Sequence, residues 1–118
     1  MRMWMLPPKL LCAKHLGGEH NELHKLAGCI TRNRSLRGYI VNNFIELKSI
    51  VKRHDELAEE LVRRGGSHNS PLPELGDLPD LGKVDLSFNE QDLRARCASC
   101  DARFLFARGS YAGAIQSR

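Results

Sequence analysis

The sequence predicts a small, single all-α domain, and three observations carry this prediction. The chain has 118 residues, which is the size of one ordinary domain. Apolar residues recur at helical spacing over residues 9–33 and, more regularly, over 45–64. Gly and Pro are concentrated in residues 65–87, which predicts a long loop. We therefore expect two main amphipathic helices and, after the loop, a shorter third helix over 88–107.

Composition indicates a folded protein with a mild basic excess. Hydrophobic residues make up 42% and charged residues 27%, a globular balance. The 18 basic and 14 acidic residues give a net charge of +4, which permits a nucleic-acid partner without requiring one. No apolar run approaches the roughly 18 residues of a membrane span, and the first residues lack a signal-peptide pattern. We expect a cytoplasmic monomer (in the host cell if phage-encoded) with no membrane partner.

The first helix has one apolar face and one titratable face. Glu22, Lys25 and Cys29 share a row on the side opposite the apolar residues. Gly17-Gly18 lowers helix propensity, so a bend or a close approach is expected there. The predicted buried face consists of Leu16, His20, Leu23, Leu26, Ala27 and Ile30.

The second helix has the cleaner pattern. Gly65 follows two arginines and is a typical C-terminal stop. Ser87 with Glu90 predicts a capping box at the start of the third helix. Residues 1–8 look extended, 34–44 form a basic connector, 1–107 form the domain, and 108–118 are expected to be a flexible tail. The apolar stripe of the second helix is Leu47, Ile50, Val51, His54, Leu57, Ala58, Leu61 and Val62.

Histidines suggest a first chemical constellation. His20 and His24 are four residues apart on one helix, a spacing that can bind a metal ion, and His54 and His68 could complete a site. The pattern lacks HExxH and a fitted ligand carboxylate. His20 and His54 also lie within the apolar stripes. We therefore interpret them as hydrogen-bonded core histidines rather than metal ligands.

Cysteines suggest a second constellation. Cys97-Ala98-Ser99-Cys100 is a CxxC pair that could hold half of a zinc site. Cys12 and Cys29 do not form a second such pair. We expect reduced thiols, no bound metal and no cofactor, with Cys97 and Cys100 as the candidate ligands if zinc is bound.

Basic and acidic side chains suggest a third chemical constellation. Glu22 is surrounded by titratable groups (His15, Glu19, His20 and His24), conditions that can raise a carboxyl pKa toward general acid/base use. The basic residues could bind phosphate or could form a solvated surface, and charge alone favours neither. They are Arg32, Arg34, Arg37, Lys48, Lys52, Arg53, Arg63 and Arg64, interleaved with Tyr39 and Phe44.

These residues resemble a known family. The segment H-L-G-G-E-H-N-E-L-H-K-L-A-G at 15–28 is similar to the first helix of the phage-type pyrimidine-dimer DNA glycosylases, the endonuclease V group of UV repair, whose pattern is roughly H-L-x-x-E-x-R-E-L-x-R-x-x-G. The segment E-L-A-E-E-L-V-R-R-G at 56–65 resembles the end of another family helix. Arg2 also matches the family, in which an arginine directly follows the N-terminal residue. The likeness covers about residues 1–65 and is faint beyond.

The resemblance implies a repair mechanism and a pair of catalytic groups. Family members are compact α-helical proteins that attack C1′ of a damaged nucleotide with their N-terminal α-amine, form an imine, release the base and cut the strand by β-elimination. The essential acid/base maps onto Glu22, and the amine, 21 positions earlier, onto Met1. Arg2 is bulky, so Met1 should be retained. An α-amine with a reference pKa of about 7.7–8.0 is partly neutral near pH 7.

The resemblance also predicts a double-stranded damaged DNA partner and the residues that contact it. Two family arginines beside the glutamate are replaced by Asn21 and Lys25, and the family's aromatic C-terminal tail has no clear counterpart. Lyase chemistry is therefore better supported than recognition of a pyrimidine dimer. The expected DNA contacts are Arg2, Asn21, Lys25, Arg32, Arg34 and Arg37, and the expected supporting residues are His15, Glu19, His20 and His54.

Two other functions fit the residues. One is a non-catalytic helical module that binds nucleic acid or protein and is stabilised by zinc at Cys97 and Cys100. The other is a metal-dependent hydrolase that uses His20, His24 and His54. Metal content and chelator sensitivity discriminate them from the glycosylase/lyase, which should work in EDTA.

Overall fold

A computed structural model describes the backbone of residues 1–116 and the side chains of residues 1–108. Residues 1–116 form helices and contain no strand, so the prediction of an all-α domain is confirmed. The α-helices are α1 (Ala13–Thr31), α2 (Arg37–Val41), α3 (Ile50–Arg63), α4 (Leu86–Arg96) and α5 (Ala98–Gln116), and the 3₁₀ turns are η1 (Pro8–Leu10) and η2 (Leu47–Ser49).

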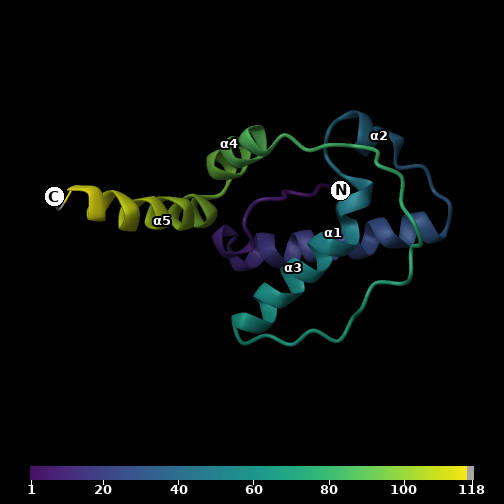
Figure 1. Cartoon of the computed structure of the whole chain (residues 1–118), viewed down its shortest axis with the longest axis horizontal. Coiled ribbons are helices and arrows are strands. Elements are labelled where there is room, and N and C mark those ends of the chain that lie inside the picture. The colour runs from purple at the N-terminus through teal and green to yellow at the C-terminus, as the bar shows by residue number, and fades with distance from the viewer. Residues whose placement is uncertain (117–118) are drawn as a thin grey trace.

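Helix α1 is the centre of the fold (Figure 1). It runs through the middle of the body, and α3 crosses it and packs against it. The predicted face of α1 is buried apart from Ile30, which is half-buried, and α1 continues through Gly17-Gly18, where an added Cβ would meet nothing within 4 Å. The core between α1, α3 and the N-terminal segment includes Met3, Leu6, Leu16, Leu23, Leu26, Ile45, Ile50 and Leu57.

The N-terminal segment is part of this core. Met3 and Trp4 are buried, and the Met3 amide donates a 2.8 Å hydrogen bond to the Phe44 carbonyl. In Figure 1 the segment runs antiparallel to α1, so its first residue lies farthest toward the C-terminal end of that helix. The segment expected to be extended over residues 1–8 is thus fixed against α1, but its extended conformation is interrupted at Met5, which has φ of +59°, and ends before Pro8, the first residue of η1.

The buried face of α3 is rotated from the predicted stripe. Val51 and Val62 are exposed, whereas Arg53 and Glu60 are buried. Both polar side chains have charged partners, which is the condition for burying a charge in a folded protein. Hydrophobic periodicity could not identify them because the partners come from other parts of the chain or from the last turn of the helix.

The predicted loop is present between α3 and α4. Gly65 has φ of +94° and ends α3 as expected. The loop then wraps around one end of the body and returns to α4 (Figure 1), and Leu72, Leu75 and Leu78 pack against the core. The Leu47 amide bonds to the Leu81 carbonyl at 3.0 Å, so the end of the loop is also fixed by its backbone.

The predicted third helix is in fact two helices. Cys97 has an extended backbone and separates α4 from α5, so the single helix expected over 88–107 was wrong. Helix α4 also begins earlier than expected, because the Asp85 side chain, not Ser87, caps it by accepting from the Phe88 amide at 3.0 Å. Of the tail expected over 108–118, α5 includes the range to Gln116, and residues 117 and 118 lie outside the described residues.

Candidate functional site

The start of the chain lies against the glutamate-bearing helix. Met1 is half-buried and packs against the hydrophobic core. The Met5 amide lies 3.5 Å from Glu19 Oε2, which ties the segment to α1 near the middle of the helix. Because Met1 precedes Met5 along a segment antiparallel to α1, it lies on the side of the later turns of that helix (Figure 1).

Glu22 occupies the next turn of α1. It lies about 4.5 Å along the helix axis from Glu19, on the C-terminal side. Its side chain is half-buried, while its neighbours Asn21 and Lys25 are exposed. The carboxylate is thus partly shielded but reachable, whereas the two positions that replace family arginines face solvent.

Glu19 has a different role from Glu22. Both its oxygens accept hydrogen bonds from Arg53, at 2.7 Å from Nε and 2.9 Å from Nη2. The two side chains are almost completely buried. Arg53, one of the candidate phosphate contacts, is therefore unavailable to DNA, and the supporting residue Glu19 joins α1 to α3.

Arg2 is held by α4. Its guanidinium donates to Asp92 Oδ2 at 2.6 Å and to Asn89 Oδ1 at 2.7 Å, and it lies 4.0 Å from the Trp4 ring centroid. Asn89 also donates to the Trp4 carbonyl at 3.0 Å. These contacts orient the N-terminal segment. A phosphate contact by Arg2 stays a prediction, and it would compete with Asp92.

The remaining predicted DNA contacts form a continuous basic stretch. No Asp or Glu occurs between Glu22 and Glu46. Along the end of α1 and the start of α2, the side chains are exposed and make no ion pair among the residues whose side chains are described. They are Lys25, Arg32, Arg34 and Arg37. We call this set the basic stretch, and its chemistry suits an anionic backbone.

Four histidines meet between α1, α3 and the following loop. His20 and His24 of α1, His54 of α3 and His68 of the loop each offer a ring nitrogen, and the four nitrogens lie within 4.8 Å of one another. The Nε2 atoms of His24 and His54 are 3.2 Å apart, and those of His20 and His68 are buried without a hydrogen-bond partner. The prediction that His20 and His54 lie in the core is confirmed, and His54 is hydrogen-bonded as expected, whereas His20 Nε2 is buried without a hydrogen-bond partner.

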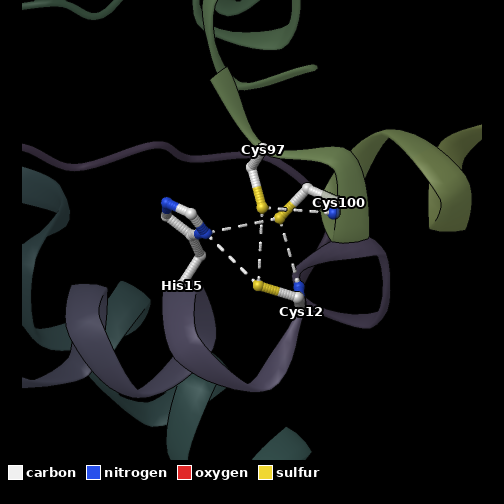
Figure 2. A group of neighbouring side chains, drawn as sticks. All are labelled: Cys12, His15, Cys97 and Cys100. Carbon is white, nitrogen blue, oxygen red and sulfur yellow. Dashed lines mark hydrogen bonds between the residues drawn. The ribbon is translucent and has the colours of Figure 1, made fainter. Parts of the chain in front are cut away.

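A second cluster joins the start of α1 to the junction of α4 and α5 (Figure 2). Cys12, His15, Cys97 and Cys100 point their side chains toward one another, and their ligand atoms lie within 4.8 Å. The pair Cys12-x-x-His15 was missed from the sequence, where only Cys12 and Cys29 were compared as partners. Its signal was the same two-residue spacing as in Cys97-x-x-Cys100, next to the start of a helix.

Burial perturbs the titration of both clusters. Burial lowers the pKa of His20 to about 4, with the other three histidines adding to the effect, and burial also lowers the pKa of His24. Burial raises the pKa of Cys100 to about 12, whereas the Cys100 amide hydrogen bond lowers the pKa of Cys97. The imidazoles of His20 and His24 are therefore neutral at pH 7, as metal ligands must be.

The chain matches one family of known proteins. A family model described as pyrimidine dimer DNA glycosylase matches residues 1–74, which is more than half of the sequence. The chain therefore belongs to this family, as its resemblance to these glycosylases predicted. No curated protein and no solved structure matched the chain. The matched region includes Met1, Glu22 and the basic stretch, and it ends before α4 and α5.

Among the helices of residues 1–116, none combines the length and the apolar character that crossing a bilayer requires.

Proposed function

We propose that the protein is a DNA repair glycosylase with AP lyase activity, in which the Met1 α-amine is the nucleophile and Glu22 the acid/base. The observation that carries this proposal is the family match over residues 1–74, because that region contains both groups. The coarse geometry supports the pairing. The Met5 amide lies 3.5 Å from Glu19 Oε2. From Met5 back to Met1, the segment runs along α1 in the direction of the turn that carries Glu22 (Figure 1).

The chemistry requires an amine and a carboxylate that both reach the sugar of the bound nucleotide. The neutral Met1 nitrogen forms a bond to C1′ while the bond from C1′ to the base breaks, and the base leaves with a proton. Opening of the sugar ring gives an imine between nitrogen and C1′. Removal of a C2′ proton then expels the 3′ phosphate by β-elimination. Glu22 transfers the protons at the sugar, a role for which a half-buried carboxyl is suited once the bound DNA brings the sugar within hydrogen-bond reach.

DNA binding is assigned to the basic stretch. Its four cations are exposed and face no acidic side chain of the same segment. They would contact phosphates and position the duplex, while extrusion of the damaged nucleotide would bring its sugar to Met1. Because Asn21 and Lys25 stand where the family has arginines, we propose an abasic site or a damaged base as substrate without specifying a pyrimidine dimer. The protein would act as a monomer on DNA in the cytoplasm.

Borohydride trapping tests the proposal. The full chain, with its native N-terminus, is incubated with duplex DNA that contains one abasic site, in EDTA and borohydride. The expected result is one covalent adduct that maps to the peptide starting at Met1. An N-terminally acetylated protein should form no adduct, and Glu22→Gln should form far less, whereas Glu59→Gln, an exposed glutamate of α3, should match the wild type.

Two outcomes would reject the mechanism. The first is no adduct from a folded protein with a free N-terminus. The second is an adduct that persists after both acetylation and Glu22→Gln, because the nucleophile would then be another amine.

A further inference from the structure

We propose that Cys12, His15, Cys97 and Cys100 form a tetrahedral zinc site that fastens α4 and α5 to the family core. Three cysteines and one histidine are a common ligand set of structural zinc. Two of the ligands come from the matched region and two from beyond it. The site is separate from the proposed lyase chemistry.

The spacing of the ligand atoms fits zinc. Zn–S bonds of about 2.3 Å and Zn–N bonds of about 2.0–2.1 Å imply tetrahedral edges of about 3.8 Å between sulfurs and about 3.6 Å between sulfur and nitrogen. Cys12 Sγ and Cys97 Sγ are 3.8 Å apart, and Cys100 Sγ lies 3.6 Å from His15 Nδ1. The remaining measured edge, from Cys12 Sγ to His15 Nδ1, is 3.2 Å.

The backbone is arranged around the sulfurs as in a metal knuckle. The Cys12 amide donates to Cys100 Sγ at 3.3 Å, and the Cys100 amide donates to Cys97 Sγ at 3.4 Å. Such hydrogen bonds stabilise thiolates and orient them. The ligands also lie at fixed points of the fold, since Cys12 caps α1 and Cys97 ends α4.

The charges around the cluster favour binding of zinc by three thiolates and a neutral imidazole. Three thiolates, a neutral imidazole and Zn²⁺ carry a net charge of −1. Lys14 and Arg96 place positive charge next to His15. Binding would release the thiol protons, and the resulting anionic site would be compensated locally.

Cobalt(II) titration of the reduced full chain tests the site, because cobalt bound by thiolates gives a charge-transfer absorption in the near ultraviolet. We expect this band to saturate at the intensity of one thiolate-bound cobalt ion per chain and to be displaced by zinc. Cys97→Ser/Cys100→Ser should abolish it. Cys29→Ser is the matched control, because Cys29 lies on α1 outside the cluster and should leave the band unchanged.

A conservative variant keeps the test decisive if the double variant does not fold. Cys12→His retains four ligands and two of three thiolates, so the band should fall by about a third and remain stoichiometric. Absence of the band in folded, reduced wild type would overturn the proposal. So would a band that survives Cys97→Ser/Cys100→Ser.

The histidine cluster independently carries a second proposal. We infer that His20, His24, His54 and His68 bind one divalent transition-metal ion, tested here as zinc, through their Nε2 atoms. Imidazoles are favoured ligands of such ions, and tetrahedral zinc would hold neighbouring nitrogens about 3.3 Å apart. The measured separation of the His24 and His54 Nε2 atoms is 3.2 Å.

The unpartnered nitrogens are the observation specific to this cluster. Nε2 of His20 and Nε2 of His68 are buried and have no hydrogen-bond partner, which is costly unless a ligand takes their lone pairs. His54 Nδ1 lies 3.0 Å from Asp55 Oδ1. That bond places the proton on Nδ1 and leaves Nε2 as a donor to metal, an outer-shell arrangement common in zinc sites.

Elemental analysis and a ligand exchange test this second site. The wild type should hold two equivalents of zinc and Cys97→Ser/Cys100→Ser one. Adding His68→Gln to that variant should remove the last equivalent, whereas adding Asn69→Ala, an exposed neighbour, should not. In the same background, His68→Cys should create a cobalt–thiolate band that was absent. Zinc content unaffected by His68→Gln, or no band from His68→Cys, would overturn the site.

Discussion

Arg53 of α3 and Glu19 of α1 form a bidentate ion pair inside the protein, with 2% and 0% of their side chains exposed. The pair fixes the register of the two main helices, because both guanidinium–carboxylate bonds require one relative position. It thereby sets where Glu22, one turn further along α1, lies relative to the N-terminal segment.

Breaking this pair should destabilise the fold. Arg53→Ala leaves the Glu19 carboxylate buried without its charged partner, so we expect a loss of about 3–5 kcal/mol in the free energy of unfolding. The measurement is urea denaturation followed by circular dichroism. The double variant Glu19→Leu/Arg53→Met removes both charges and should recover most of the loss. A loss below about 1 kcal/mol for Arg53→Ala would show that the pair is not buried in solution.

Replacing the proposed acid/base should affect turnover and not folding. Glu22→Gln should slow single-turnover cleavage of abasic-site DNA by about 10²–10⁴-fold. Glu22 makes no ion pair among the side chains described through residue 108, so the free energy of unfolding should change by less than about 0.5 kcal/mol. Equal losses of activity and stability would instead indicate a structural glutamate.

The glycines of α1 and of the loop should respond in opposite directions to alanine. Gly17→Ala and Gly18→Ala place a methyl group in open space within a helix, so each should stabilise the protein by about 0.5–1 kcal/mol. Gly82 has φ of +85°, and its added Cβ would lie 2.3 Å from the Ile45 carbonyl oxygen, so Gly82→Ala should destabilise. Thermal unfolding measures the melting temperature of the three variants, which should rise for Gly17→Ala and Gly18→Ala and fall for Gly82→Ala. A shift in the opposite direction would contradict the prediction for that glycine.

Acid should weaken the end of α3. Hydrogen bonding from Arg63, with Arg64 adding to it, lowers the pKa of Glu60 below its usual 4.5. A carboxyl whose pKa is lowered by folding contributes its full stabilisation at pH values above its pKa in the unfolded chain. This contribution is lost as the pH falls through its pKa in the folded protein. Glu60→Gln should therefore show a smaller stability loss between about pH 6 and pH 3 than the wild type. Parallel pH profiles would contradict this assignment.

The basic stretch should govern the salt dependence of DNA binding. Arg34→Gln should weaken binding to duplexes of any sequence and reduce the slope of log K against log salt by about 0.9, since one phosphate contact is lost. Arg63→Gln is the control, because Arg63 is paired with Glu60. Fluorescence anisotropy at several salt concentrations measures both. An unchanged slope for Arg34→Gln would remove this residue from the interface.

Local patterns were sufficient for α1, α3 and the loop between α3 and α4. The apolar spacing of the two helices, the stop at Gly65 and the Gly/Pro content of the loop are all local features, because each depends only on residues close together in the sequence. The prediction of a single third helix failed because the helix breaks at Cys97, which has an extended backbone and whose side chain lies in a cluster with Cys12 and His15 from a distant part of the sequence. Similarly, Arg53 and Glu60 looked like surface residues, because their charged partners are not visible in an apolar period.

The candidate site was predictable only where a family pattern existed. The sequence around Glu22 predicted a helix and a resemblance to the glycosylases, and α1 and the family match confirm these two points. The acid/base role of Glu22 stays a prediction. The histidine cluster was considered and set aside, since His20, His24, His54 and His68 lack a standard motif and meet only when α3 crosses α1. Only half of the cysteine cluster was predicted, because the sequence identified the pair Cys97 and Cys100 but not Cys12 and His15 as its partners.

The cysteine cluster also has a consequence for the order of events during synthesis. Cys12 and Cys100 are 88 residues apart, so the first pair of ligands emerges from the ribosome long before the second. Helices α1 and α3 are thus synthesised while this cluster is still incomplete. Capture of the ion would thus be the closing event of maturation, and a prematurely terminated chain would be left with an unpaired thiol and imidazole that quality-control proteases could reach.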